Sequence, residues 1–241
     1  MIEKNYVLDQ KVNIKKNDLD LVYQIHEYGL DLRTNNIYLY GEKDYALGAG
    51  AEATNEPGVE YIMAGKFIKN LNLCMRINHS SPILIHMKTC GGDWSEGMAI
   101  FDAIKSCPNP VTILSYTHAR SMSSLILQAA NKRILMPTSY VMIHDGTLGI
   151  EGTVKSVTSY VDFNNKTTDI MMNVYYEAMK KNGKFKSKSK KDILEWLRRQ
   201  MNKKEEVYFT SQQAVEYGFA DEIFDYDWSK LTAYSDEQLS R

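Results

Sequence analysis

An alternation of short apolar runs with amphipathic segments constrains this chain most. Runs of strand character lie at residues 83–87, 111–117 and 133–136. The segments between them, residues 95–106 and 121–130, carry apolar side chains at helical spacing. Strand–helix–strand units of about thirty residues are typical of right-handed crossovers between parallel strands. The sequence therefore predicts an α/β fold with a mostly parallel sheet and flanking helices.

The sequence on either side extends this pattern. Residues 41–58 are rich in Gly, Ala and acidic side chains and predict a loop. Residues 154–179 predict a long helix with one buried stripe, formed by Val157, Val161, Ile170, Val174 and Tyr175. Residues 180–191 hold a lysine-rich stretch, which predicts a solvated loop or, alternatively, a contact surface for an acidic partner.

Composition limits the partners. The net charge is -1, with 44% apolar and 24% charged residues, so global charge gives no reason to expect nucleic acid or an anionic membrane. No apolar run approaches about eighteen residues, and the polar N-terminal stretch lacks the apolar centre of a signal peptide. We therefore expect a cytoplasmic protein with no membrane contact.

The cysteines predict no metal or cofactor. Cys74, Cys90 and Cys107 are an odd number at spacings that match no zinc or CxxC pattern. We expect reduced, mostly buried thiols. Cys90, beside Gly91 and Gly92, is the one whose reactivity is worth testing, although a packing role is the simpler interpretation.

Serines stand at three expected helix starts. Ser95 and Ser211 are predicted to cap their helices through the side-chain oxygen. Ser121 opens a helix directly after a strand, and it has two interpretations. It is either another cap or a nucleophile, because a helix N-terminus offers N–H groups and a partial positive charge to a developing oxyanion.

Three chemically suited positions follow strand ends. Gly92, Ser121 and His144 each lie just beyond an apolar strand candidate, and such loops build sites at the carboxyl edge of a parallel sheet. Together they offer a nucleophile, a general base and an oxyanion hole made by the main-chain N–H groups of Gly92 and Met122. No G-x-S-x-G elbow is present, which argues against an α/β-hydrolase.

Four segments, in order and spacing, resemble those of the Clp protease proteolytic subunit (ClpP) family, including its phage-type members. The segments are CGGDWSEGMAIFDAI, ARSMSSLIL, VMIHDG and FTSQQAVEYGFADEI. They resemble the family's PGG…GMAIYD, AASMGAFLL, VMIHQP and FMSAEEAKEYGLID segments. The resemblance runs from about residue 36 to 224.

The resemblance implies a ClpP/crotonase fold of repeated β-β-α units and a serine endopeptidase that cleaves unfolded or extended polypeptides through an acyl-enzyme. Ser121, His144, Gly92 and Met122 then take the roles given above. The family's third catalytic residue is an aspartate, and counting back from Ala214 puts Glu206 in its place. A glutamate can orient a histidine if its carboxylate comes within hydrogen-bond reach.

Several departures accompany that match. Glu205 is the second choice for the acid, and either glutamate is alternatively a solvated charge. Ser123 replaces a family glycine and Cys90 a family proline.

Gly149 and Gly152 fall in a run that resembles the family's substrate-pairing handle segment, where strand addition would bind extended chains. Ordinary loop flexibility is the alternative.

The resemblance also implies assembly and boundaries. It implies homo-oligomeric rings of seven subunits, stacked in pairs, and a separate AAA+ unfoldase ATPase, since no G-x-x-x-x-G-K-[ST] pattern occurs. We divide the chain into an N-terminal segment (1–35) of unknown role, a peptidase domain (36–226) and a polar C-terminal tail (227–241). Phage-type members suggest capsid maturation as an alternative to general degradation.

Two other functions stay open. One is a catalytically inactive ring or scaffold subunit, which the replacement of aspartate by Glu206 favours. The other is a crotonase-type acyl-CoA enzyme, which shares the fold and the pair of oxyanion amides but does not need Ser121 and His144 together.

Overall fold

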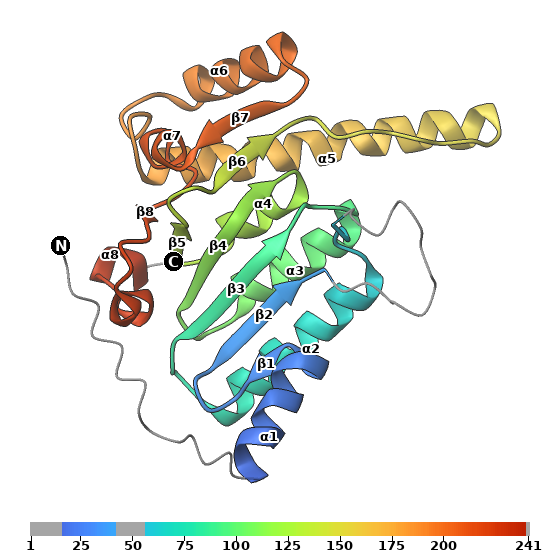
Figure 1. Cartoon of the computed structure of the whole chain (residues 1–241). Coiled ribbons are helices and arrows are strands. Elements are labelled where there is room, and N and C mark those ends of the chain that lie inside the picture. The colour runs from blue at the N-terminus through green and yellow to red at the C-terminus, as the bar shows by residue number, and fades with distance from the viewer. Residues whose placement is uncertain (1–15, 42–55, 240–241) are drawn as a thin grey trace.

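A computed structural model describes residues 16–41 and 56–239. Most of the loop expected at residues 41–58 therefore lies outside the described residues. The centre of the molecule is a sheet whose main path runs β1-β2-β3-β4-β5-β8, with β6 paired to β4 and β7 to β6 (Figure 1). The strands are β1 (Leu30–Asp31), β2 (Asn36–Tyr40), β3 (Ile83–Thr89), β4 (Val111–Arg120), β5 (Lys132–Leu135), β6 (Tyr140–Ile143), β7 (Val207–Thr210) and β8 (Glu222–Ile223).

Most strand pairs are parallel, as predicted. Only β1–β2 and β6–β7 pair antiparallel among the described strands. Strand β4 is the longest described strand, and it forks: Thr112–Ser115 pair with β5, whereas His118–Arg120 pair with β6. The fork brings the end of β6 alongside the end of β4, which decides where the site forms.

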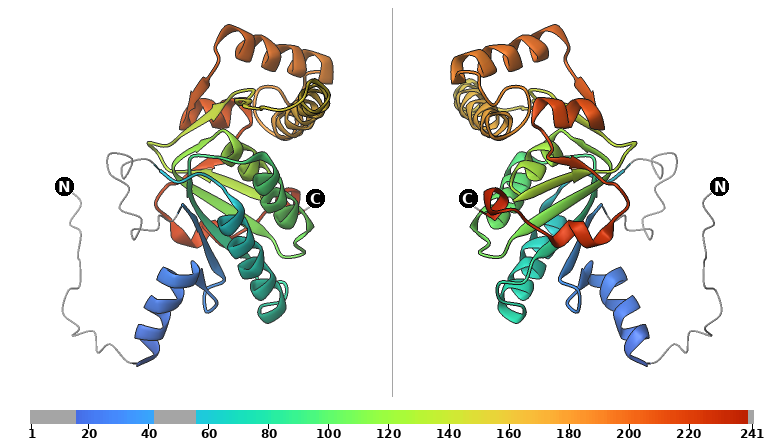
Figure 2. Two further views of the ribbon diagram at one scale, coloured as in Figure 1. Left: turned by 90° about the vertical axis from the view of Figure 1, so that its right-hand side faces the viewer. Right: turned by 90° about the vertical axis from the view of Figure 1, so that its left-hand side faces the viewer.

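Helices cover the sheet. They are α1 (Lys16–Tyr23), the π-helix η1 (Gln24–Tyr28), α2 (Tyr61–Ile77), α3 (Trp94–Ser106), α4 (Met122–Gln128), α5 (Val154–Lys181), α6 (Lys190–Lys203), α7 (Ser211–Tyr217), the 3-10 helix η4 (Trp228–Thr232) and α8 (Asp236–Leu239). Helices α2 and α3 lie together on one face (Figure 2). There, Ile85 and Ile113 of the sheet join Ile100 of α3 and Leu71 of α2 in the main core.

Two predicted serine caps are wrong. Helix α3 is capped by Asp93, whose carboxylate accepts a hydrogen bond from the N–H of Glu96 at 2.9 Å. Helix α7 is capped by Thr210, which forms a reciprocal capping box with Gln213. In both cases a capping side chain one or two positions earlier in the sequence takes the place of Ser95 or Ser211.

The segment after β8 packs on the sheet through η4. Leu231 of η4 is 1% exposed and joins Leu84, Leu114 and Phe224 in a second, smaller core. The hydroxyl of Thr112 donates to the carbonyl of Leu231 at 2.6 Å. Part of the predicted N-terminal segment is likewise tied in, since β1 pairs with β2.

Helix α5 extends beyond the body of the molecule. Figure 1 shows its N-terminal half projecting past the sheet, with the segment after β6 running back along it. Of the expected stripe, Tyr175 is buried and Val174 packs against the core, whereas Val161 and Ile170 are exposed. The other buried side chains of α5 are Thr167, Met171, Met172, Ala178 and Met179. The stripe is therefore confirmed at Val174 and Tyr175 and wrong at Val161 and Ile170, because much of this helix projects past the sheet and has no core to face.

The lysine-rich stretch divides between the end of α5, the loop 182–189 and the start of α6. In the loop, Lys184 pairs with Glu216 at 2.6 Å and lies over the ring of Tyr217. Among the described helices, none combines the length and apolarity needed to cross a bilayer.

Candidate active site

The Ser121 hydroxyl does not cap α4. It makes no capping hydrogen bond, and its Oγ lies 2.8 Å from Nε2 of His144. The backbone of Ser121 has φ 52° and ψ -130°, a conformation that costs a non-glycine residue about 1–3 kcal/mol. A strained backbone that turns a hydroxyl toward an imidazole favours the nucleophile interpretation over the cap.

Neighbouring serines hold this turn. Ser123 Oγ donates to the carbonyl of Arg120 at 2.7 Å and accepts from the N–H of Arg120 at 2.9 Å. Ser124 Oγ donates to the carbonyl of Ser121 at 2.6 Å. Ser123, which stands where the resembling family segment has a glycine, therefore closes the turn that presents Ser121.

The imidazole arrives from the adjacent strand. The N–H of Ser121 donates to the carbonyl of Met142 at 2.9 Å, which extends the β4–β6 pairing to Ser121. His144 follows immediately after β6 and is partly buried. Strand pairing thus fixes the approach of the two side chains that the sequence placed at neighbouring strand ends.

Glycines bring a second main-chain segment against Ser121. Gly91 has φ 96°, and a Cβ there would lie 2.7 Å from Cβ of Ser121 and 2.8 Å from the nitrogen of Met122. The bridge between Val59 and Gly92 uses the N–H groups of Val59 and Asp93, so the N–H of Gly92 stays outside it. The N–H of Met122, in the first turn of α4, has no intrahelical acceptor.

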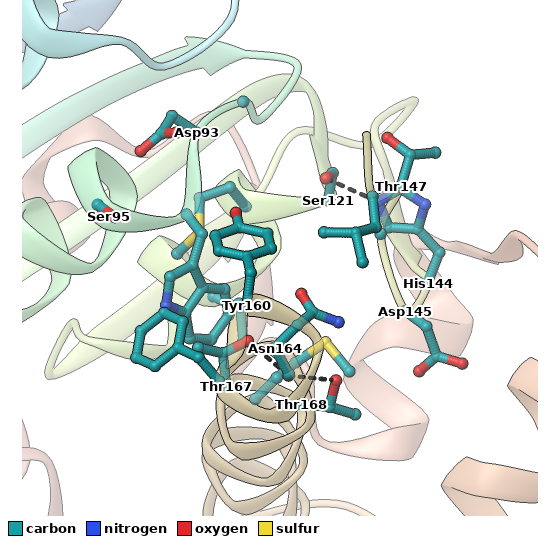
Figure 3. Close-up of a pocket in the computed structure, with 18 of the residues that line it drawn as sticks. Asp93, Ser95, Ser121, His144, Asp145, Thr147, Tyr160, Asn164, Thr167 and Thr168 are labelled. Carbon is teal, nitrogen blue, oxygen red and sulfur yellow. Dashed lines mark hydrogen bonds between the residues drawn. The ribbon is translucent and has the colours of Figure 1, made fainter. Parts of the chain in front are cut away.

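One cleft of about 490 Å³ is lined by all four residues of the predicted site: Gly92, Ser121, Met122 and His144. Figure 3 shows Ser121 and His144 on one side of it and side chains of α5 on the other. The α5 residues are Tyr160, Phe163, Asn164, Thr167, Thr168, Met171 and Tyr175. Sequence analysis missed this wall; the only available signal was the pair of aromatic residues Tyr160 and Phe163 on a largely polar stretch.

A carboxylate partner for His144 is not in place. In the β6–β7 ladder Ile143 faces Val207, so the next antiparallel positions are His144 and Glu206. Glu206 is exposed, however, and its carboxylate accepts a hydrogen bond from the hydroxyl of Tyr208. Within the described part of the chain, His144 makes one side-chain hydrogen bond, the one to Ser121.

Two other carboxylates, those of Asp145 and Glu205, are not hydrogen-bonded to the imidazole of His144 either. Asp145 follows His144 but points away from the imidazole in Figure 3. Glu205 is exposed and makes no hydrogen bond to His144. The structure therefore brings Ser121, His144, Gly92 and Met122 together, and among residues 16–41 and 56–239 no acid is hydrogen-bonded to Nδ1 of His144.

The predicted substrate glycines lie outside the cleft. Gly149 and Gly152 are exposed, whereas Gly146, Thr147 and Leu148 of the same run line the cleft. A Cβ at Gly149 would meet no atom within 4 Å, so nothing in the folded subunit requires glycine there.

Cys90 does not have the environment of a reactive thiol. Burial, followed by the nearby Glu56 charge, raises the pKa of Cys90, so the thiolate is scarce at neutral pH. Among the described residues, no group of three or more His, Cys, Asp or Glu side chains is arranged to hold a metal ion.

Comparison with known proteins decides the family. A sequence model of the Clp protease family matches residues 55–227. The chain belongs to the Clp protease family. An "ATP-dependent Clp protease proteolytic subunit" of Deinococcus radiodurans is 26% identical over 84% of this chain and 91% of its own. Proteolytic subunit 1 of Streptomyces avermitilis is 28% identical over 68% of this chain and 71% of its own.

A shorter match to proteolytic subunit 2 of Treponema denticola reaches 34% identity over 39% of this chain and 48% of its own. These findings confirm the ClpP-family resemblance and the α/β fold read from the sequence. The region matched by the Clp protease family contains all the side chains that line the cleft.

Proposed function

We propose that this member of the Clp protease family is a serine endopeptidase that cleaves unfolded or extended polypeptides through an acyl-enzyme. The observation that carries the proposal is the 2.8 Å contact between Ser121 Oγ and His144 Nε2, in the same cleft as the N–H groups of Gly92 and Met122. The matched family and the names of its proteolytic subunits support the same reaction class.

The reaction follows from these positions. As Ser121 Oγ attacks the peptide carbonyl carbon, His144 Nε2 accepts its proton, and the carbonyl oxygen becomes an oxyanion near the N–H groups of Gly92 and Met122. Collapse of the tetrahedral intermediate breaks the C–N bond, and His144 returns the proton to the departing amine. Water, deprotonated by His144, then attacks the ester carbon and releases Ser121 with its proton.

We assign Glu206 as the residue that orients His144 in the working state, with Glu205 as the alternative. The β6–β7 register supports Glu206, because directly opposed side chains lie about 5 Å apart at Cβ. The assignment requires the Glu206 carboxylate to leave the hydroxyl of Tyr208 and meet Nδ1 of His144.

We further propose that residues 36–226 act within a homo-oligomeric ring, of seven subunits and stacked in pairs, in the cytoplasm. The projecting part of α5 supports self-association, because it exposes Val154, Tyr160 and Phe163 by 83%, 45% and 54%. The relatives are named ATP-dependent, so a separate AAA+ ATPase is the proposed partner, and Gly149 and Gly152 are proposed to pair with substrate. A phage-type role in capsid maturation is the narrower alternative.

The test compares wild type with Ser121→Ala on a fluorogenic peptide and on an unfolded protein. Wild type is expected to hydrolyse both, and Ser121→Ala to lose about 10⁴-fold or more in kcat/KM. Equal thermal unfolding midpoints show that both are folded. Activity that survives in Ser121→Ala would contradict the proposal.

A catalytically inactive scaffold subunit is the second candidate, favoured by the absence of a hydrogen-bonded acid on His144 among the described residues. It predicts that wild type assembles into rings and hydrolyses no peptide, with or without an ATPase. Acyl-CoA turnover by Ser121→Ala would instead favour the crotonase-type alternative.

A further inference from the structure

A buried pair of side chains joins two segments next to the cleft. Nε2 of His118, on β4, lies 2.8 Å from Oε2 of Glu56, although not in the line of a straight hydrogen bond. The side chain of His118 is 8% exposed and that of Glu56 is 21% exposed. His118 precedes Ser121 on β4, whereas Glu56 belongs to the segment that enters α2. Neither has a role in the reaction described above.

Residues 56–60, which lead into α2, contact Gly91 and Gly92, the second of which is the proposed oxyanion-hole glycine. The N–H of Val59 donates to the carbonyl of Gly91 at 2.5 Å, and the carbonyl of Val59 accepts from the N–H of Asp93 at 2.9 Å. A Cβ at Gly92 would lie 2.3 Å from the carbonyl oxygen of Val59, so this contact is close. A Cβ at Gly58 would likewise lie 2.8 Å from the carbonyl oxygen of Gly91.

These contacts form a closed series that includes Ser121 and Gly92. Strand β4 leads from His118 to Ser121, and Ser121 lies against Gly91. Gly91 and Gly92 pair with Val59, whose segment returns through Glu56 to His118. The Glu56–His118 contact therefore completes this series, because it joins the segment before α2 to β4.

We propose that Glu56 and His118 are positioning residues that hold the main-chain N–H of Gly92 toward Ser121. This inference rests on the proposed peptidase function. An oxyanion hole acts only if its donors point at the place where charge develops, and a misplacement of about 1 Å can cost about 100-fold in rate. The Glu56–His118 pair links the segment of Val59 to β4, the strand that precedes Ser121. It therefore keeps the N–H of Gly92 at a fixed position relative to the hydroxyl of Ser121.

The charges around the pair explain why a carboxylate is needed. Burial lowers the pKa of His118, the Glu56 charge opposes that shift, and the cations Arg120 and Lys88 add to it. Lys88 Nζ lies 3.7 Å from Oε1 of Glu56, and the ring of Tyr140 lies 5.4 Å from that of His118. Glu56 is the carboxylate in a group that otherwise holds Lys88, Arg120 and a titratable imidazole.

The test measures kcat and KM of the full chain as wild type, Glu56→Gln, His118→Gln and the double variant. We expect each single variant to lose about tenfold or more in kcat with KM within about twofold. The double variant is expected to lose no more than the worse single variant, because the two residues act as one unit. Affinity for a peptide boronic acid, whose tetrahedral adduct uses the oxyanion hole, is expected to fall by the same factor as kcat.

Lys88→Gln is the matched control, because it removes a half-exposed cation at the same site and leaves the Glu56–His118 contact intact. It is expected to change kcat less than about twofold. An unchanged kcat in both single variants, or an equal loss in Lys88→Gln, would overturn the inference.

Amide hydrogen exchange of residues 88–94 separates this inference from the proposed function. Glu56→Gln is expected to exchange faster there than wild type, with protection of α3 and α4 unchanged. If wild type proves inactive, the proposed function fails, and unchanged exchange at 88–94 would independently overturn the positioning role. Should Glu56→Gln not fold, His118→Gln serves in the same comparison.

Discussion

Two polar clusters on the same sheet differ in how completely their groups are paired. At β5, the Arg133 side chain is 2% exposed, and its guanidinium donates to Asp221, to Oε1 of Gln128 at 2.6 Å and to the carbonyl of Gly218 at 2.9 Å. The Asp221 carboxylate also accepts from the main-chain N–H of Arg133 and from the side-chain amide of Asn182.

At the other end of the sheet, beside the cleft, buried atoms lack well-aligned protein partners. Four of the six such side-chain atoms among the described residues lie there: Oε1 of Glu56, Nε2 of His118, Nε of Arg120 and Oγ1 of Thr89. The other two are Nε2 of His86 on β3 and Oγ of Ser139 before β6. Ser121 adds a backbone with positive φ, and within the described residues no acid is hydrogen-bonded to His144. Incomplete pairing is costly to stability, so the four atoms beside the cleft favour a site kept for chemistry, while the Arg133 cluster serves the fold.

His144→Ala should produce the largest effect. It should lower activity and leave the free energy of unfolding nearly unchanged. Removing the proposed general base is expected to lower kcat/KM on a fluorogenic peptide by about 10⁴-fold or more, because the hydroxyl of Ser121 then loses its hydrogen-bonded proton acceptor. The free energy of unfolding, measured by urea titration, should change by less than about 1 kcal/mol, since the imidazole is only partly buried. A loss of several kcal/mol would erase the contrast between the clusters.

Arg133→Met should produce the reverse pattern. It leaves the buried Asp221 charge without its partner and is expected to cost about 3–5 kcal/mol of unfolding free energy. The fraction that stays folded should keep a normal KM. Pairing it with Asp221→Asn should recover part of the loss, and a neutral effect of Arg133→Met would show that this cluster is not the stabilising one.

Low pH should lower the free energy of unfolding through the same Arg133–Asp221 cluster. Burial alone would raise the pKa of Asp221, but the attraction of Arg133 and its hydrogen bonds hold that pKa below the ordinary value of 3.8. A carboxyl whose pKa is lower in the folded state contributes stability above its unfolded pKa and loses it as pH falls through the folded value. Urea titrations from pH 7 to pH 2 should show a loss below about pH 4, and this loss should be smaller in Asp221→Asn.

Tyr208→Phe should have the smallest effect. It frees the Glu206 carboxylate from its hydroxyl partner and should raise kcat by a few-fold if Glu206 then orients His144. Adding Glu206→Gln should abolish the gain. If Tyr208→Phe gives no gain and Glu206→Gln alone gives no loss, Glu206 has no part in the site.

Local pattern predicted the sheet and the convergence at its edge. Ser121 and His144 were predictable because each closely follows an apolar run of strand character, and neighbouring parallel strands end at the same edge. The contribution of α5 to the cleft could not be predicted. A periodic pattern identifies a buried helix face only where a core lies on one side, and much of α5 has no core beside it. The Glu56–His118 contact was equally hidden, since no local rule links a residue of a loop to one inside β4.

The central claim is that Ser121 is a nucleophile activated by His144. The most direct measurement is the intact mass, followed by peptide mapping, after treatment with a fluorophosphonate, which labels only an activated serine. We expect one adduct per chain on Ser121 in wild type and none in His144→Ala. An unlabelled wild type, or an equally labelled His144→Ala, would contradict it.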